Sequence, residues 1–132
     1  MLAITKQSDY GLILTSFVYK KNRLIKLSEL IEETKLPKRF LARIAAKLTK
    51  EGLLISKEGK TGGYLISPRV KTISLYGYLT IFENDVMVSS CSDKDFECRY
   101  EKVCHHKDFI KQKLNVILIK ELKKIKLLQL ID

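Results

Sequence analysis

Hydrophobic and polar positions alternate at helical spacing in the first part of the chain. The first apolar stripe recurs at steps of three and four residues and consists of Tyr10, Ile13, Leu14, Phe17 and Val18. This spacing predicts an amphipathic helix over residues 5–20. Thr5 is a suitable N-cap for that helix, because a threonine hydroxyl can accept a hydrogen bond from a free N–H group of the first turn.

Two shorter helices are predicted next. One opens at Ser28 and ends near Lys35, with glutamates close to its positive N-terminal end. The other begins at Pro37, which suits a first helical turn because proline has no N–H group to leave unpaired. Its predicted buried stripe is Phe40, Leu41, Ile44, Ala45 and Leu48. Gly52 is a natural stop for this third helix.

A β-hairpin is predicted after the third helix. The short apolar segments 53–56 and 64–66 flank a stretch, 57–63, that contains three glycines and two lysines. Three helices, with a short connection before the third, followed by a basic hairpin form the plan of a winged helix-turn-helix. The sequence therefore predicts a DNA-binding domain over residues 1–70.

The remainder of the chain is expected to hold a fourth helix, capped by Thr72 or Ser74, and one long last helix. The long helix is predicted from His105 almost to Asp132, with apolar positions at Ile110, Leu114, Leu118, Leu122, Ile125 and Leu128. A helix this long and apolar exceeds what so small a domain covers, so we expect it to pair with a second copy of the chain. The predicted fold class is mainly α with a small β-hairpin wing, a winged helix-turn-helix plus a long C-terminal dimerisation helix.

The composition is that of a soluble globular protein with a strong positive charge. The 132 residues include 25 Lys and Arg against 15 Asp and Glu, which gives a net charge of +10. Such a surplus favours a polyanionic partner, although lysine-rich proteomes also produce basic proteins without one. No apolar run is long enough to span a membrane and no secretory signal is evident, so we expect a cytoplasmic protein without a membrane partner.

The third helix and the hairpin carry the candidate DNA contacts. Arg39 and Arg43 are four residues apart and share one helix face, from which arginine can pair with guanine in the major groove. A solvated polar face would give the same pattern. The hairpin favours the interpretation as a DNA-binding surface, because its lysines can contact phosphates and its glycines let its backbone approach the DNA closely. The full set of expected DNA-binding residues is Lys38, Arg39, Arg43, Lys47, Lys57, Lys60, Thr61, Gly62 and Gly63.

Three cysteines, Cys91, Cys98 and Cys104, fall in a segment, 84–103, that has neither helical nor strand periodicity. Three thiols cannot all pair as disulfides within one chain, and clustered thiolates hold zinc or iron–sulfur clusters. The wide spacing lacks the tight pairs typical of zinc, and free thiols remain an alternative. The nearby donors that could complete a metal site are His105, His106, Glu97 and Glu101. No nucleophile–base pair, phosphate-binding loop or paired acids are found, so an enzyme is not expected.

These features together resemble the winged-helix iron–sulfur transcription regulators that include IscR and NsrR. The resemblance covers essentially the whole chain. Its motifs are the opening 4–10 (ITKQSDY), the start of the third helix at 36–41 (LPKRFL), the turn 52–54 (GLL), the wing 59–65 (GKTGGYL) and the cysteine triplet before a long helix.

The resemblance implies a homodimer joined through the last helix and a cluster-binding loop and dimerisation helix within residues 71–132. It also implies an iron–sulfur cluster held by Cys91, Cys98 and Cys104, with a 4Fe–4S cluster favoured and a 2Fe–2S cluster as the alternative. In IscR-like members a histidine three residues after the last cysteine completes the ligand set, but this chain has Lys107 there. In NsrR-like members an aspartate of the first helix, supplied by the partner subunit, completes the site, and Asp9 stands at that position.

Two departures from the family pattern affect what can be carried over. The first cysteine interval is one residue longer than usual, and Ala42 replaces an acidic base-reading residue of IscR. We therefore expect a dimeric repressor that binds a palindromic operator and senses nitric oxide or redox state, as in the NsrR-like branch. The alternatives are an IscR-like regulator of cluster biogenesis and a zinc-stabilised DNA-binding protein without a sensing role. Without a cluster, the loop from Asn84 to Val103 is expected to be mobile.

Overall fold

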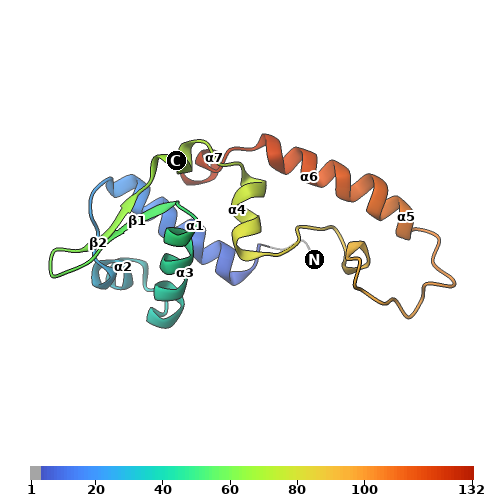
Figure 1. The fold of residues 1–132 in the computed structure, drawn as a ribbon, viewed down its shortest axis with the longest axis horizontal. Coiled ribbons are helices and arrows are strands. Elements are labelled where there is room, and N and C mark those ends of the chain that lie inside the picture. The colour runs from blue at the N-terminus through green and yellow to red at the C-terminus, as the bar shows by residue number, and fades with distance from the viewer. Residues whose placement is uncertain (1–3) are drawn as a thin grey trace. The chain divides into compact units, whose positions relative to one another are not determined.

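The computed structural model describes residues 4–132, and the first three residues of the predicted DNA-binding domain lie outside the described part. The described chain forms two compact units (Figure 1). One comprises Ile4–Ile73 together with Lys126–Asp132, and the other comprises Ser74–Ile125. The predicted fold class, mainly α with a two-stranded hairpin, is confirmed. None of the helices in the described chain has both the length and the apolar character needed to cross a membrane.

The first unit begins with the three predicted helices, α1 (Lys6–Lys21), α2 (Leu27–Thr34) and α3 (Lys38–Lys50). Thr5 is the N-cap of α1, as predicted, because its hydroxyl oxygen accepts from the N–H of Ser8 at 3.4 Å. Asn22 and Lys35 end α1 and α2 in the left-handed region. The prediction that Ser28 opens α2 is wrong, because α2 begins directly after an extended Lys26.

The buried faces of α1 and α3 differ from the predicted stripes. Of the predicted α1 stripe only Leu14 and Val18 are buried, and Tyr10 and Phe17 are half-buried. Ile13 on α1 is 41% exposed, whereas Thr15 is fully buried and its hydroxyl donates to the Gly11 carbonyl oxygen at 2.7 Å. A threonine whose hydroxyl is paired within its own helix can thus occupy a core position. Phe40 on α3 is 39% exposed and packs edge-on against Tyr10, with ring centroids 6.2 Å apart. The rest of the predicted α3 stripe, Leu41, Ile44, Ala45 and Leu48, is buried.

The predicted hairpin is formed by β1 (Leu54–Lys57) and β2 (Gly63–Ile66), which pair antiparallel with Leu54 opposite Ile66. A third segment joins them, because Ile25 in the connection between α1 and α2 exchanges two backbone hydrogen bonds with Tyr64. These bonds measure 2.9 Å and 2.8 Å between N and O. The connection before α2 is therefore tied directly to the wing.

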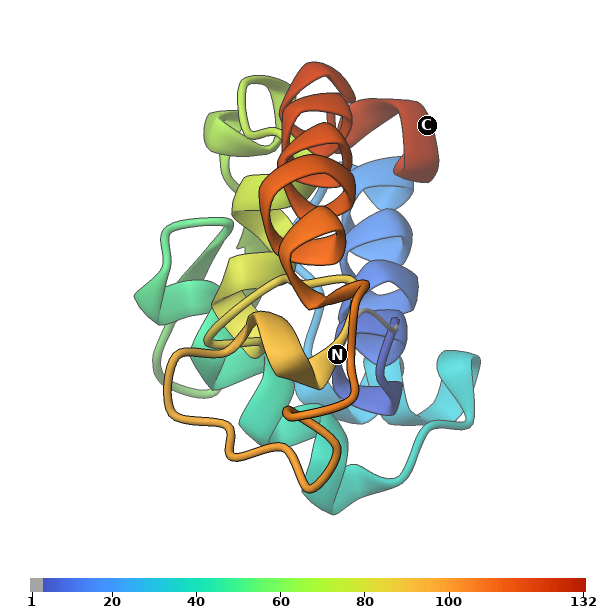
Figure 2. The same ribbon diagram turned by 90° about the vertical axis from the view of Figure 1, so that its right-hand side faces the viewer.

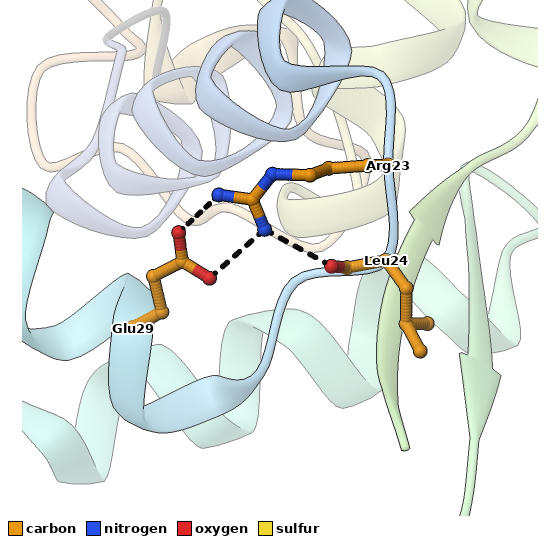
Figure 3. A network of polar contacts seen from close by, with 3 residues as sticks. All are labelled: Arg23, Leu24 and Glu29. Carbon is orange, nitrogen blue, oxygen red and sulfur yellow. Dashed lines mark hydrogen bonds and ion pairs between the residues drawn. The ribbon is translucent and has the colours of Figure 1, made fainter. Parts of the chain in front are cut away.

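An ion pair stabilises the same connection (Figure 3). The Arg23 guanidinium donates to both carboxylate oxygens of Glu29 in the first turn of α2, with 3.1 Å between Nη1 and Oε2. Its Nη1 also donates to the carbonyl oxygen of Leu24 at 3.2 Å. The hydrogen bond from Arg23 lowers the pKa of the Glu29 carboxyl, and the same bond raises the pKa of Arg23. This contact links the connection after α1 to the first turn of α2.

The short 3₁₀ helix η1 (Pro68–Lys71) follows the wing, and the last segment of the chain returns to this unit as α7 (Leu128–Ile131). Leu127 and Ile131 are buried. The N–H of Leu127 donates to the Ile73 carbonyl at 3.0 Å, and the Ser16 hydroxyl donates to the Ile131 carbonyl at 3.1 Å. The C-terminal segment is therefore part of the core around α1.

The second unit contains α4 (Leu75–Phe82), the 3₁₀ turn η2 (Ser90–Ser92) and a helical run made of α5 (Lys107–Phe109), the π-helical segment η3 (Ile110–Leu114) and α6 (Asn115–Lys124). Of the two predicted caps, Thr72 and Ser74, it is Ser74 that caps α4, by accepting from the Gly77 N–H at 3.0 Å. The predicted helix from His105 almost to Asp132 is wrong after Lys124, because Ile125 is extended. Its carbonyl oxygen accepts from the N–H of Leu75 at 2.7 Å instead of continuing the helix.

Candidate functional site

The outer face of α3 presents the predicted DNA-reading side chains to solvent. Lys38, Arg39 and Arg43 are exposed, and Lys47 is half-buried. Arg39 and Arg43 form no ion pair within residues 4–132. Because the opposite face of α3 is held in the core, these two arginines project from a fixed helix toward any ligand that lies along it. Unpaired guanidinium groups on such a helix are suited to base edges and phosphates.

The wing places its cations on an exposed turn. Lys57, Lys60 and Thr61 are exposed, and Gly62 is buried at the neck of the turn. A Cβ atom at Gly62 would lie 2.2 Å from the Lys57 carbonyl oxygen, so only glycine allows this closure. The predicted wing residues therefore lie together, and Gly62 acts through the shape of the turn.

A hollow of about 480 Å³ lies at the base of the wing, between the turn and the start of α2. Lys26, Lys57 and Lys60 line it, together with Ser28 and one acidic residue, Glu58. Sequence reasoning missed Lys26 and Ser28 as candidates for phosphate contact, because the backbone pairing of Ile25 with Tyr64 brings them to the wing. The only signal in the sequence was the lysine itself, next to a short connection.

The end of α3 is fixed by a residue that follows the wing. The Arg69 guanidinium donates to the carbonyl oxygen of Glu51, the C-cap residue, at 2.6 Å. Cationic groups are favourable at a helix C-terminus, where carbonyl oxygens lack partners. Arg69, which lies in η1 directly after β2, therefore links the end of the wing to the C-terminus of α3.

The cysteine loop, which we define as residues 84–106, consists of turns and irregular backbone (Figure 2). Its one regular element is the short 3₁₀ helix η2. Cys91, Cys98 and Cys104 are free thiols, and each is half-buried. The Cys98 sulfur accepts from the N–H of Tyr100 at 3.4 Å, and the Cys104 sulfur lies 3.6 Å from Nδ1 of His106. Within residues 4–132 no three His, Cys, Asp or Glu side chains converge on one point.

The other predicted donors differ in their surroundings. His105 and His106 are exposed; Nδ1 of His106 lies 3.6 Å from the Cys104 sulfur, and His105 lines a shallow hollow together with Cys104 and Glu101. Glu101 forms an ion pair with Lys107 at 3.0 Å, and this hydrogen bond raises the pKa of Lys107. Glu97 is exposed. Asp9 is exposed in the first turn of α1, and its role as a ligand from a partner subunit stays a prediction.

The donor set fits an iron–sulfur cluster in its chemistry. Three thiols on one loop supply the soft ligands that such clusters need, and an N–H group already points at one of the sulfurs. A histidine nitrogen lies next to another sulfur. The loop would have to draw the three sulfurs together on binding, which its lack of regular structure allows.

Comparison with known proteins places the chain among transcriptional regulators. A stretch of 90 residues is 26% identical to an Aquifex aeolicus (strain VF5) protein named as a transcriptional regulator of the HTH type, and the match covers 67% of this chain but only 62% of that protein. Two solved structures have the same fold. One is CymR, the global cysteine regulator of B. subtilis (TM-score 0.71, 21% identity, 99% of this chain and 97% of that one). The other is T. potens IscR (TM-score 0.65, 20% identity, 96% and 84%).

A family model provides the assignment. The model for Rrf2, described as an iron-dependent transcriptional regulator, matches residues 4–132. This confirms the resemblance to the winged-helix regulators and the prediction that the chain is not an enzyme. The chain belongs to the Rrf2 family of transcriptional regulators.

Proposed function

We propose that this protein is a dimeric, sequence-specific DNA-binding repressor whose iron–sulfur cluster senses nitric oxide or redox state. The observation that carries the DNA-binding part is the unpaired, exposed pair Arg39 and Arg43 on a helix anchored by its opposite face. The observation that supports the sensing part is the presence of three free cysteines on one irregular loop of an Rrf2 chain.

In the proposed complex α3 enters the major groove and its arginines contact base edges. The wing lysines, Lys57 and Lys60, lie on the flanking phosphates, and Lys26 extends that contact toward the start of α2. Because the connection before α2 is hydrogen-bonded to β2, the phosphate contacts and the helix are held in one unit. Phosphate contacts then set the position of the protein, and the arginines set its sequence preference.

Cys91, Cys98 and Cys104 are the proposed ligands of the cluster, with the partner's Asp9 as the fourth ligand of a 4Fe–4S cluster. His105 and His106 are the alternative fourth ligands. A bound cluster would supply an iron centre that reacts with nitric oxide or oxygen. The role of the chain's own residues is to hold the loop: the three thiolates would gather segments that are otherwise joined only by turns. Loss of that restraint would change the population of the DNA-binding conformation.

A second copy of the chain is the proposed partner of the helical run from α5 to α6. Phe109, Val116 and Ile117 are more than half exposed on it, and none of the residues of α6 is buried. An apolar helix face of this kind is stabilised by burial against another subunit. A two-fold dimer would place two α3 helices on a palindromic operator.

Two alternative functions are compatible with the same residues. An IscR-like regulator would use the cluster to report the supply of clusters in the cell. A zinc-stabilised protein is favoured by one contact, the 3.6 Å approach of the Cys104 sulfur to His106, because three cysteines and one histidine form a common structural zinc site.

One preparation separates these functions. The protein is purified without oxygen, its visible spectrum is recorded, and iron, sulfide and zinc are assayed. Iron and sulfide in comparable amounts, with operator binding that changes when nitric oxide is added, would support the sensor. Equal operator affinity of the cluster-bound and cluster-free forms would contradict it, and zinc without sulfide would replace it with the zinc-stabilised protein.

A further inference from the structure

A hollow of about 310 Å³ lies within the unit formed by residues 74–125. Its walls are the first turn of α4, at Tyr76, the segment 85–94 and one side of the helical run. The helical side presents Lys111, Asn115 and Ile119, which are spaced four apart and so share a face. Lys111 belongs to the π-helical segment η3, which ends directly before Asn115, and such segments are frequent at functional sites. The volume suits a small ligand.

The floor of the hollow is apolar and fixed in place. Val86 and Met87 are buried, with 6% and 7% exposure. The Asn115 side-chain oxygen accepts from the N–H of Val88 at 2.9 Å, which ties this segment to the helix. The Asn115 amide N–H groups make no hydrogen bond within residues 4–132, so they are free to donate to a ligand. The apolar lining can therefore receive an apolar group of a ligand, and the Asn115 amide beside it can donate a hydrogen bond to a polar group of that ligand.

Ser92 also lines the hollow, and its hydroxyl oxygen lies just beneath the surface of the hollow. This oxygen is shielded from solvent and has no hydrogen-bond partner in the described chain. Buried polar atoms are nearly always paired, so an unpaired one next to a hollow points to a polar partner that enters from it. Ser92 belongs to η2 and directly follows Cys91.

Charges of both signs line the hollow. Asp85 and Asp93 contribute carboxylates, and Lys94 and Lys111 contribute ammonium groups. None of the four forms an ion pair within residues 4–132. Unpaired charges of both signs around an apolar floor are complementary to a ligand that carries both an ammonium and a carboxylate group. Two carboxylates flanked by two lysines are, by contrast, a poor cation site, because the lysines repel a metal ion.

We propose that this hollow binds a small zwitterionic ligand, a free α-amino acid with an apolar side chain. Asp85 and Asp93 receive its ammonium group, and Lys111 receives its carboxylate. The Ser92 hydroxyl and the Asn115 amide hydrogen-bond to the ligand, while its side chain lies on Val86 and Met87. This binding does not depend on the proposed repressor function. If that function holds, an occupied hollow would restrain η2 and thereby the neighbouring Cys91.

The first test uses the full-length protein and compounds that differ by one charged group. L-Leucine, L-methionine and L-phenylalanine are titrated by calorimetry and by ligand-observed NMR. Isoamylamine lacks the carboxylate of leucine, and isocaproate lacks its ammonium group. We expect at least one of the amino acids to bind. For leucine we expect each truncated analogue to bind at least about tenfold more weakly, which is the usual cost of losing a charge-assisted hydrogen bond. Failure of all three amino acids to bind, or equal binding of leucine and its two analogues, would overturn the proposal.

Two variants then assign the charges. Lys111→Gln should weaken the binding of leucine but leave that of isoamylamine unchanged, because only leucine presents a carboxylate. Asp93→Asn should weaken leucine but leave isocaproate unchanged. Lys120→Gln, on the same helical run but outside the hollow, is the matched control, and circular dichroism checks that all three variants are folded. An equal loss of leucine binding in Lys120→Gln and Lys111→Gln would reject the site, whatever its effect on DNA binding.

Discussion

The backbone of Gly63 lies directly against the backbone of Ile25. A Cβ atom at Gly63 would stand 2.4 Å from the Ile25 carbonyl oxygen, and the φ angle of Gly63 is +152°. The wing and the connection before α2 can therefore join only where a glycine allows this approach. The same contact brings Lys26 to the base of the wing, where it lines a hollow with Lys57 and Lys60.

Gly63→Ala should destabilise the first unit and weaken DNA binding. The added methyl group must push the Ile25 backbone away, and the strained backbone angle adds a cost, so we expect a loss of about 2 kcal/mol or more in the free energy of unfolding. Urea denaturation, monitored by circular dichroism, measures this change in the free energy of unfolding. Gly59→Ala is the control, because Gly59 also has a positive φ, +98°, but nothing lies within 4 Å of its added Cβ. Equal losses in the two variants would show that backbone strain alone, and not the contact with Ile25, matters.

Arg43→Ala and Lys60→Ala should weaken DNA binding in different ways. Arg43 is proposed to contact a base, so its loss should cost about 1–3 kcal/mol and relax sequence preference at one position. Lys60 is proposed to contact a phosphate, so its loss should weaken all sequences alike and reduce the salt dependence. Fluorescence anisotropy with an operator selected from random DNA, at several salt concentrations, measures both effects. Lys120→Ala removes the same charge from α6 and is the control. If Arg43→Ala kept the sequence preference of the wild type, the proposal that α3 contacts the bases through Arg43 would be wrong.

Leu127→Ala should destabilise the first unit although it lies near the end of the chain. Leu127 is fully buried, and truncation of a buried leucine costs about 2–5 kcal/mol. Leu130→Ala is the matched control from the same segment, because Leu130 is 42% exposed and its loss should cost much less. Thermal unfolding of the two variants compares them. Similar melting temperatures would mean that the return of the chain to α1 contributes little to stability.

The sequence predicted the elements of this protein better than their contacts. Apolar spacing located α1, α3 and the hairpin, because each of these elements carries its own periodicity. It missed the end of the last helix, because Leu128 continues the apolar spacing. The helix stops where Ile125 accepts a hydrogen bond from Leu75, a contact between residues distant in the chain. Local periodicity does not contain such information.

The candidate sites show the same division. The exposed arginines of α3 and the wing lysines follow from residue type and spacing, so they could be predicted. Lys26 could not be placed at the wing, because its position depends on backbone pairing between Ile25 and Tyr64. The exposure of Ile13 was missed for a related reason, since Thr15 satisfies its hydroxyl inside α1 and takes the core position.

Acid should weaken the connection between α1 and α2 through the ion pair of Arg23 with Glu29. The hydrogen bond from Arg23 lowers the pKa of Glu29 below its usual value. A carboxyl group whose pKa is lowered in the folded state stabilises that state above its unfolded pKa, and this contribution is lost as the pH falls through the lowered value. Glu29→Gln should therefore have a lower melting temperature than the wild type at neutral pH, with the difference shrinking in acid. Both groups are substantially solvent-exposed, so the measurement belongs at low salt, where screening is weak.

Arg23→Gln separates this ion pair from the favourable position of Glu29 in the first turn of α2. Removal of the arginine should reproduce the loss seen in Glu29→Gln, and the double variant should be little worse than either single variant, because the two groups act as a pair. Glu32→Gln is the control on the same helix, since Glu32 is exposed and has no ion-pair partner within residues 4–132. If Arg23→Gln kept the full pH dependence of the wild type, the helix dipole rather than the ion pair would be the source of the stabilisation by Glu29.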